Sequence, residues 1–141
     1  MEYLHSEITG EIINAFYAVY NELGYGFLER VYKNALYKEL KKRGFECSAE
    51  HSIPVYYQGE RVGDYFADII VNVIIIIELK AVKTILPEHE AQLMNYLRAT
   101  DAEIGLLLNF GPEPQKRRLI FTNDRKKSII NTLSNPNIIK G

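Results

Sequence analysis

Two acidic residues and a lysine lie close to the longest apolar run of the sequence, residues 73–77. Asp68 precedes this run, and Glu78 and Lys80 follow it directly. A run so rich in β-branched residues predicts a strand that is buried on both faces. Charges at the rim of such an interior cost several kcal/mol each in desolvation if they are unpaired. These three side chains therefore need a compensating partner or a bound ion.

The spacing of the two acids predicts that they face each other. Asn72 offers a reversal of the chain, and Asp68 and Glu78 lie about equally far from it. Directly opposed residues in antiparallel strands have Cβ atoms about 5 Å apart, where like charges repel unless a cation lies between them. Two carboxylates with backbone carbonyls and waters suit a hard divalent ion, Mg²⁺ or Mn²⁺, and a nearby lysine can hold a water or stabilise a phosphate. The alternative is that Lys80 only forms a structural salt bridge with one of the acids.

The elements that must position these residues follow from periodicity and turn signals. Helices are predicted over residues 6–23, with Ser6 as the cap, over 29–43 and, with Pro87 in the first turn, over 87–99. Strands are predicted over residues 45–51, 53–57, 61–71, 73–80 and 104–110, with a further short strand over 119–122. The strand over 73–80 should be central in the sheet.

Composition indicates one folded domain. A chain of 141 residues with 47% hydrophobic and 25% charged residues can bury a core without disulfides or structural metal. The single Cys47 cannot form an internal disulfide, and no apolar run approaches the roughly 20 residues of a membrane span. With no secretory signal at the start, we expect a cytoplasmic protein without membrane contact. We expect a domain over residues 1–125 and a basic, Asn-rich tail over 126–141.

Charge is distributed unevenly along the chain. Residues 1–110 carry a net excess of six negative charges, whereas residues 111–141 carry an excess of five positive charges. A basic end can bind nucleic acid, and Lys116, Arg117 and Arg118 are the candidate substrate contacts, although such triplets are more often only solvated. Four tyrosines could stack bases, although helical spacing favours core packing: Tyr17, Tyr20, Tyr25 and Tyr37.

The order of these motifs resembles a known family. A glutamate that begins a helix, an aspartate on one strand, Glu-x-Lys on the next and a helix with Gln-x-x-x-Tyr together resemble the PD-(D/E)xK nuclease superfamily. Within it, the segment 26–32, Gly-Phe-Leu-Glu-Arg-Val-Tyr, is similar to the pattern that names the GxxExxY proteins. Further matching segments are residues 63–68, 77–82, 92–97 and 105–111. The resemblance extends over residues 5–121.

This resemblance implies a fold and a set of site residues. The fold is expected to be α/β, a nuclease-like mixed β-sheet flanked by α-helices. The catalytic set is expected to be Glu29, Asp68, Glu78 and Lys80, with Asp68 and Glu78 binding the metal and Glu29 completing its site or holding a metal-bound water. Lys80 would polarise the attacking water. Gln92 and Tyr96 would line the site and contact the substrate.

The expected function is therefore Mg²⁺-dependent hydrolysis of phosphodiester bonds, with DNA as the first expected substrate, although the sequence does not distinguish DNA from RNA. The alternative is a non-catalytic nucleic-acid-binding or regulatory protein on the same scaffold, because a fold does not guarantee its chemistry. A nucleic acid is the expected partner, and a homo-oligomer is compatible with the sequence. Ala67 stands before the aspartate where the superfamily pattern has proline.

Overall fold

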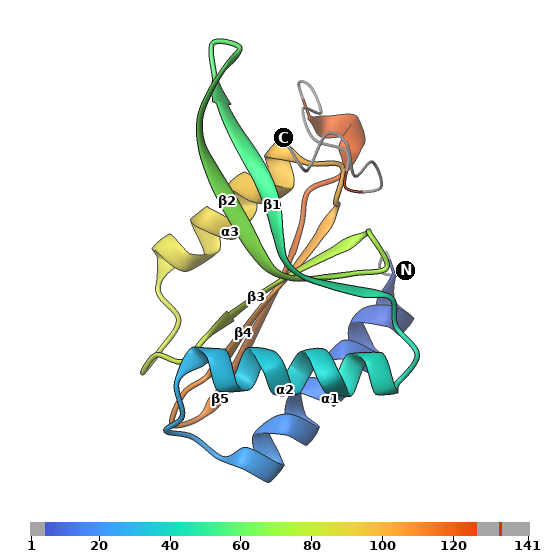
Figure 1. The fold of residues 1–141 in the computed structure, drawn as a ribbon, viewed down its shortest axis with the longest axis vertical. Coiled ribbons are helices and arrows are strands. Elements are labelled where there is room, and N and C mark those ends of the chain that lie inside the picture. The colour runs from blue at the N-terminus through green and yellow to red at the C-terminus, as the bar shows by residue number, and fades with distance from the viewer. Residues whose placement is uncertain (1–4, 127–132, 134–141) are drawn as a thin grey trace.

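The computed structural model describes residues 5–126 and residue 133, which form a five-stranded sheet with helices on both faces (Figure 1). Its elements are α1 (Ser6–Leu23), α2 (Glu29–Lys42), β1 (Cys47–Tyr57), β2 (Glu60–Val71), β3 (Ile75–Lys80), α3 (Pro87–Ala99), β4 (Ile104–Phe110), β5 (Pro114–Ile120) and the short 3₁₀ helix η1 (Asn123–Arg125). α1 and α2 pack on one face and α3 on the other. The predicted α/β class, a mixed sheet flanked by helices, is confirmed.

The sheet order is β1-β2-β3-β4-β5, the same as the order along the chain. β3 and β4 are parallel, whereas the other neighbouring pairs are antiparallel. A parallel pair needs a crossover, and α3 supplies it. This arrangement places the carboxyl end of β3 between the beginnings of α2 and α3.

The first two helices form as the 3.6-residue period predicts. α1 begins at Ser6 and ends at Leu23, and α2 ends at Lys42, one residue before the predicted end. Each helix buries one apolar stripe against the sheet. The prediction that Ser6 caps α1 is wrong, because His5 occupies the N-cap position with φ 52° and no side-chain cap bond forms.

β3 is central, as predicted, and its side chains alternate between two cores. Ile75 and Ile77 pack toward α1 and α2, whereas Ile76 packs toward α3. The strand begins at Ile75 rather than at residue 73 because Asn72 and Val73 both have positive φ and form the turn. That turn is where the sequence predicted the reversal.

β1 and β2 form a long hairpin that projects beyond the rest of the sheet (Figure 1). β1 is one strand rather than the two predicted, with a local break at Glu50, whose φ is 53°. The ladder between β2 and β3 ends at the pair Ile69 and Ile77. Beyond that pair β2 leaves β3, and the side chains at the point of separation are those of the predicted acids.

The end of the sheet differs from prediction. The last strand is β5, Pro114–Ile120, and not residues 119–122, because β5 pairs along the whole length of β4. The proposed tail falls almost entirely outside the described residues. Within the part of the chain that is described, no helix is long and apolar enough to cross a membrane.

Candidate functional site

Asp68 and Glu78 face each other where β2 and β3 separate. Extending the register by one step from the Ile69 and Ile77 pair makes them direct partners. The Asp68 backbone N–H donates to Glu78 Oε1 at 3.2 Å, and the Leu79 backbone N–H donates to Asp68 Oδ2 at 2.8 Å. The predicted opposition of the two carboxylates is confirmed, and side chains replace the ladder hydrogen bonds at this position.

The carboxylates of Asp68 and Glu78 are partly desolvated. Glu78 keeps only 7% of its surface exposed, and Asp68 is half-buried. Burial, with the Asp68 carboxylate as the next cause, raises the pKa of Glu78 to about 8. Burial also raises the pKa of Asp68, although the hydrogen bond from the Leu79 N–H works in the opposite direction. The two carboxylates therefore resist ionising together unless a cation lies between them.

Lys80 lies beside the acids without pairing with them. Its charge lowers the pKa values of Asp68, Glu78 and Glu29, so its ammonium lies within electrostatic reach of all three. No described residue forms a salt bridge with it. The structural alternative, a direct salt bridge between Lys80 and one of the two acids, does not form.

Glu29 is the first residue of α2 and approaches the same site from another element. Its pKa is raised, first by partial desolvation and then by the Asp68 carboxylate, while Lys80 opposes the rise. The side chain remains exposed. Glu29 is therefore near the opposed pair and in contact with solvent, at the positive end of a helix dipole.

α3 supplies the aromatic wall of the site. The rings of Tyr96 and Tyr65 stack with centroids 3.2 Å apart. Burial and the Glu78 carboxylate raise the pKa of Tyr96 to about 12, while Gln92, one turn earlier on the helix, lowers it. Gln92 and Tyr96 thus share one helix face beside Glu78, as their spacing predicted.

Tyr65 was not predicted as a site residue. Its hydroxyl is buried beside Glu78, and burial and that carboxylate raise its pKa. Among the described residues the hydroxyl has no hydrogen-bond partner of ordinary geometry. Residues three apart in a regular strand point to opposite faces, so alternation from Asp68 did not indicate Tyr65.

Lys33 and Glu50 form a second group next to Asp68. Lys33 Nζ lies 2.7 Å from Glu50 Oε1, and the Lys33 side chain is only 17% exposed. The Lys33 charge lowers the pKa of Asp68, and the Glu50 charge raises it. Lys33 follows Glu29 by four residues and so shares its helix face, which is a signal the sequence carried. No sequence signal indicated Glu50, which reaches this position through its left-handed backbone.

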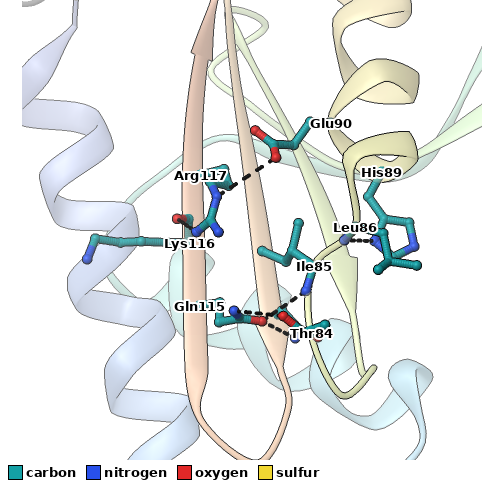
Figure 2. A network of polar contacts seen from close by, with 9 residues as sticks. Thr84, Ile85, Leu86, His89, Glu90, Gln115, Lys116 and Arg117 are labelled. Atoms are coloured by element: carbon teal, nitrogen blue, oxygen red, sulfur yellow. Dashed lines mark hydrogen bonds and ion pairs between the residues drawn. The ribbon is translucent and has the colours of Figure 1, made fainter.

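The basic triplet is divided between the two faces of the sheet (Figure 2). Lys116 contacts the Tyr17 hydroxyl of α1 at 3.2 Å, whereas Arg117 lies 3.9 Å from Glu90 of α3. Arg118 shares the Lys116 face by strand alternation. Arg117 pairs with Leu107, which pairs with Glu78, so Arg117 and Glu78 share a row about 10 Å apart. The structure therefore brings Arg117 alone of the three onto the face of Glu78.

The residues fit a divalent cation held by two carboxylates. One oxygen of each carboxylate accepts a backbone N–H, which leaves the second oxygen of each outside these two hydrogen bonds. Mg²⁺ commonly binds through one or two carboxylates and retains waters. Among the described residues, no three acidic, His or Cys side chains are close enough to hold a metal together. Glu29 lies outside the opposed pair, and its place in the metal site stays a prediction.

The mixed five-stranded sheet flanked by helices, with opposed acids and a lysine at the end of its central strand, is an α/β fold of the nuclease-like class. The sequence model of the PD-(D/E)XK nuclease superfamily matches residues 6–119. The chain belongs to the PD-(D/E)XK nuclease superfamily. No curated protein matches it significantly in sequence.

Among solved structures, the chain is similar to the crystal structure of SSO0001. The superposition has a TM-score of 0.54 with 23% sequence identity, and it covers 66% of this chain. It covers 50% of the SSO0001 chain, so the present chain matches half the length of that protein. At this identity the likeness supports the fold.

Proposed function

We propose that this protein is a metal-dependent nuclease of the GxxExxY type that hydrolyses phosphodiester bonds in DNA. The observation that carries the proposal is the opposed Asp68 and Glu78 pair, with Lys80 beside it and without a salt bridge to any described residue. A salt bridge that only stabilised the sheet would neutralise this lysine. An ammonium left free beside two desolvated acids is instead available to a substrate.

In this proposal Asp68 and Glu78 hold Mg²⁺, or Mn²⁺ in its place. When bound, such an ion supplies Lewis-acid stabilisation of charge on the scissile phosphate. Lys80 positions the attacking water and polarises it. Glu29, exposed and near Asp68, orients a water rather than binding the ion directly, which agrees with its place outside the opposed pair.

The other residues of the site contact the substrate. Gln92 and Tyr96 line the α3 side, and Arg117 extends the same face toward the edge of the sheet. Lys116 and Arg118 lie on the opposite face and would reach only a strand that wraps around β5. The alternative function is nucleic-acid binding without hydrolysis at the same surface. Only a cleavage assay distinguishes it from the nuclease.

The test is incubation of the full chain with labelled single-stranded, duplex and branched DNA, with Mg²⁺, with Mn²⁺ and with chelator. We expect metal-dependent cleavage that Asp68→Asn, Glu78→Gln or Lys80→Ala each reduces by about 100-fold or more. The matched control is Asp64→Asn, which alters an exposed aspartate on the same strand. Binding without cleavage in every metal, or full activity in a folded Lys80→Ala variant, contradicts the proposal.

A further inference from the structure

A groove next to the candidate site is lined by three connections of the chain. They are residues 25–28 between α1 and α2, residues 81–83 after β3, and residues 110–112 between β4 and β5, and together they enclose about 570 Å³. This volume is within the range of ligand sites. These connections converge at one end of the sheet (Figure 1). We call this feature the loop groove.

Two walls of the loop groove adjoin candidate-site residues along the chain. Leu28 in the groove precedes Glu29, and Ala81 in the groove follows Lys80. A polymer whose phosphate lies at Glu78 and Lys80 would have its neighbouring unit within reach of the groove, because Ala81 directly follows Lys80. Lys83 in the groove wall adds a second positive charge on this path.

Hydrogen bonds fix the first wall of the groove. The buried Tyr32 hydroxyl donates to the Gly24 carbonyl at 2.6 Å and accepts the Phe27 N–H at 3.1 Å. Gly24 and Gly26 have positive φ values of 69° and 118°, which allow the connection to turn back over this tyrosine. The Tyr32 ring stacks on Phe110 with centroids 4.3 Å apart.

Polar side chains fix the other two walls. The Asn109 side chain, which is fully buried, accepts the Val82 N–H and donates to the Val82 carbonyl, both at 3.0 Å. Gln115 continues this support by accepting from the Ile85 N–H and donating to the Thr84 hydroxyl (Figure 2). The Tyr20 hydroxyl donates to the Gly111 carbonyl at 2.7 Å. The groove is thus preformed rather than a gap between mobile loops.

The rim of this rigid groove is unusually apolar for a solvent-facing surface. Tyr25 is 63% exposed, Phe27 49% and Leu28 80%. Exposed aromatic faces beside a polar, cationic site are the features with which proteins stack the bases of single strands. A base inside a duplex already stacks on its neighbours, so only an unpaired base can offer its faces to these rings.

We propose that the loop groove binds an unpaired nucleobase of the substrate strand, next to the phosphate held at Asp68, Glu78 and Lys80. This inference rests on the proposed nuclease function for the identity of the polymer, and it adds a substrate class. The preferred substrate carries a single-stranded or flipped-out nucleotide beside the bond that is cut. Tyr25 supplies the exposed stacking face, and Lys83 contacts the adjoining phosphate.

The experiment measures binding of the full chain in chelator to a fluorescently labelled single-stranded oligothymidylate and to the same strand with abasic sites. We expect the wild type to lose between about 5-fold and 100-fold in affinity on the abasic strand, the range for one lost stacked base. Tyr25→Ala should show a loss of the same size on the intact strand and no further loss on the abasic one. The matched control is Tyr57→Ala, because Tyr57 is equally exposed, at 65%, on the projecting hairpin.

A cleavage assay with Mg²⁺ on the same strands separates the two proposals. Base-dependent binding that Tyr25→Ala abolishes, without cleavage of any strand, supports the groove and contradicts the nuclease. Cleavage of intact and abasic strands at equal rates, with equal affinities, overturns the groove and leaves the nuclease. The comparison of the two strands on wild-type protein distinguishes these outcomes even if a variant fails to fold. If the groove instead binds a protein partner, the intact and the abasic strand should bind with equal affinity. That result contradicts the nucleobase proposal.

Discussion

Glu78 combines deep burial with a neighbour of the same charge. A carboxyl group with a pKa of about 8 is mostly protonated at neutral pH in the metal-free chain. The proton on Glu78 then reduces the negative charge of the Asp68 and Glu78 pair. A divalent cation must displace that proton to bind. Burial of Glu78 thus links protonation, metal affinity and stability at a single residue.

This link gives a pH dependence with a definite sign. The folded state holds the Glu78 proton up to about pH 8, whereas the unfolded chain releases it near 4.5. Between these values the folded state binds more protons, so the free energy of unfolding in chelator should fall as pH rises, by up to about 1.4 kcal/mol per pH unit. Urea unfolding from pH 5 to 8 measures the slope. Glu78→Gln should flatten it, and Glu60→Gln, at the exposed hairpin turn, should not.

Asp68 allows a test of the metal site without substrate. A divalent ion at ten times its Kd should stabilise the wild type by about 1.4 kcal/mol, or a few degrees in melting temperature. Above pH 8, where Glu78 is ionised, Asp68→Asn removes repulsion with Glu78, so in chelator at this pH the variant should be at least as stable as wild type, and it should gain much less from Mg²⁺ or Mn²⁺. Thermal melts with chelator and with millimolar metal measure both effects. A variant less stable in chelator, beside a wild type indifferent to metal, contradicts a metal site.

At the residue scale, the sequence predicted contacts across a single turn but not contacts between distant elements. The pairing of Asp68 with Glu78 could be predicted because the two residues lie at similar distances from the turn at Asn72. The Lys33 and Glu50 pair joins a helix to a strand, and its geometry depends on the left-handed backbone of Glu50, which no residue preference predicts. Tyr65 was missed because its ring stacks on Tyr96 of α3, a contact between two elements that strand alternation from Asp68 does not indicate.

At the element scale, strong periodicity predicted the helices and the central strand, and weak periodicity misplaced the last strand. β5 contains Pro114, Gln115 and three consecutive basic residues, which together resemble a loop. It forms a strand because the fully buried β4 presents a free edge to it. Tertiary pairing overrode local preference there.

Gly111 tests how the connection after β3 is supported. A Cβ at this position would clash with the Val82 carbonyl oxygen and crowd the Asn109 side chain. Gly111→Ala should therefore displace residues 81–83 and reduce the free energy of unfolding by about 1–3 kcal/mol. Gly63→Ala, where nothing lies within 4 Å of the added Cβ, should cost far less. Equal costs in denaturant unfolding would show that the contact at Gly111 is relieved without strain.

At the scale of the whole molecule, the sheet divides the basic residues of β5 between two surfaces. Arg117 shares the face of Glu78, and Lys116 lies against α1. If nucleic acid crosses the α3 face, Arg117→Ala should reduce the slope of log affinity against log salt by about one unit, and Lys116→Ala should leave it unchanged. Titration of labelled DNA at several salt concentrations in chelator measures both slopes. Equal effects of the two variants would place the nucleic acid elsewhere.

The strands have the same order in the sheet as along the chain, and this order affects how the molecule folds. Each strand pairs with its neighbour in sequence, so every pairing closes a short loop apart from the β3–β4 crossover through α3. Loop closure costs least entropy for local contacts, and chains rich in them fold quickly. The turn at Asn72 brings Asp68 to Glu78 across only ten residues of chain. We expect the two carboxylates to meet early in folding, before α3 docks and before Glu29 reaches them from α2.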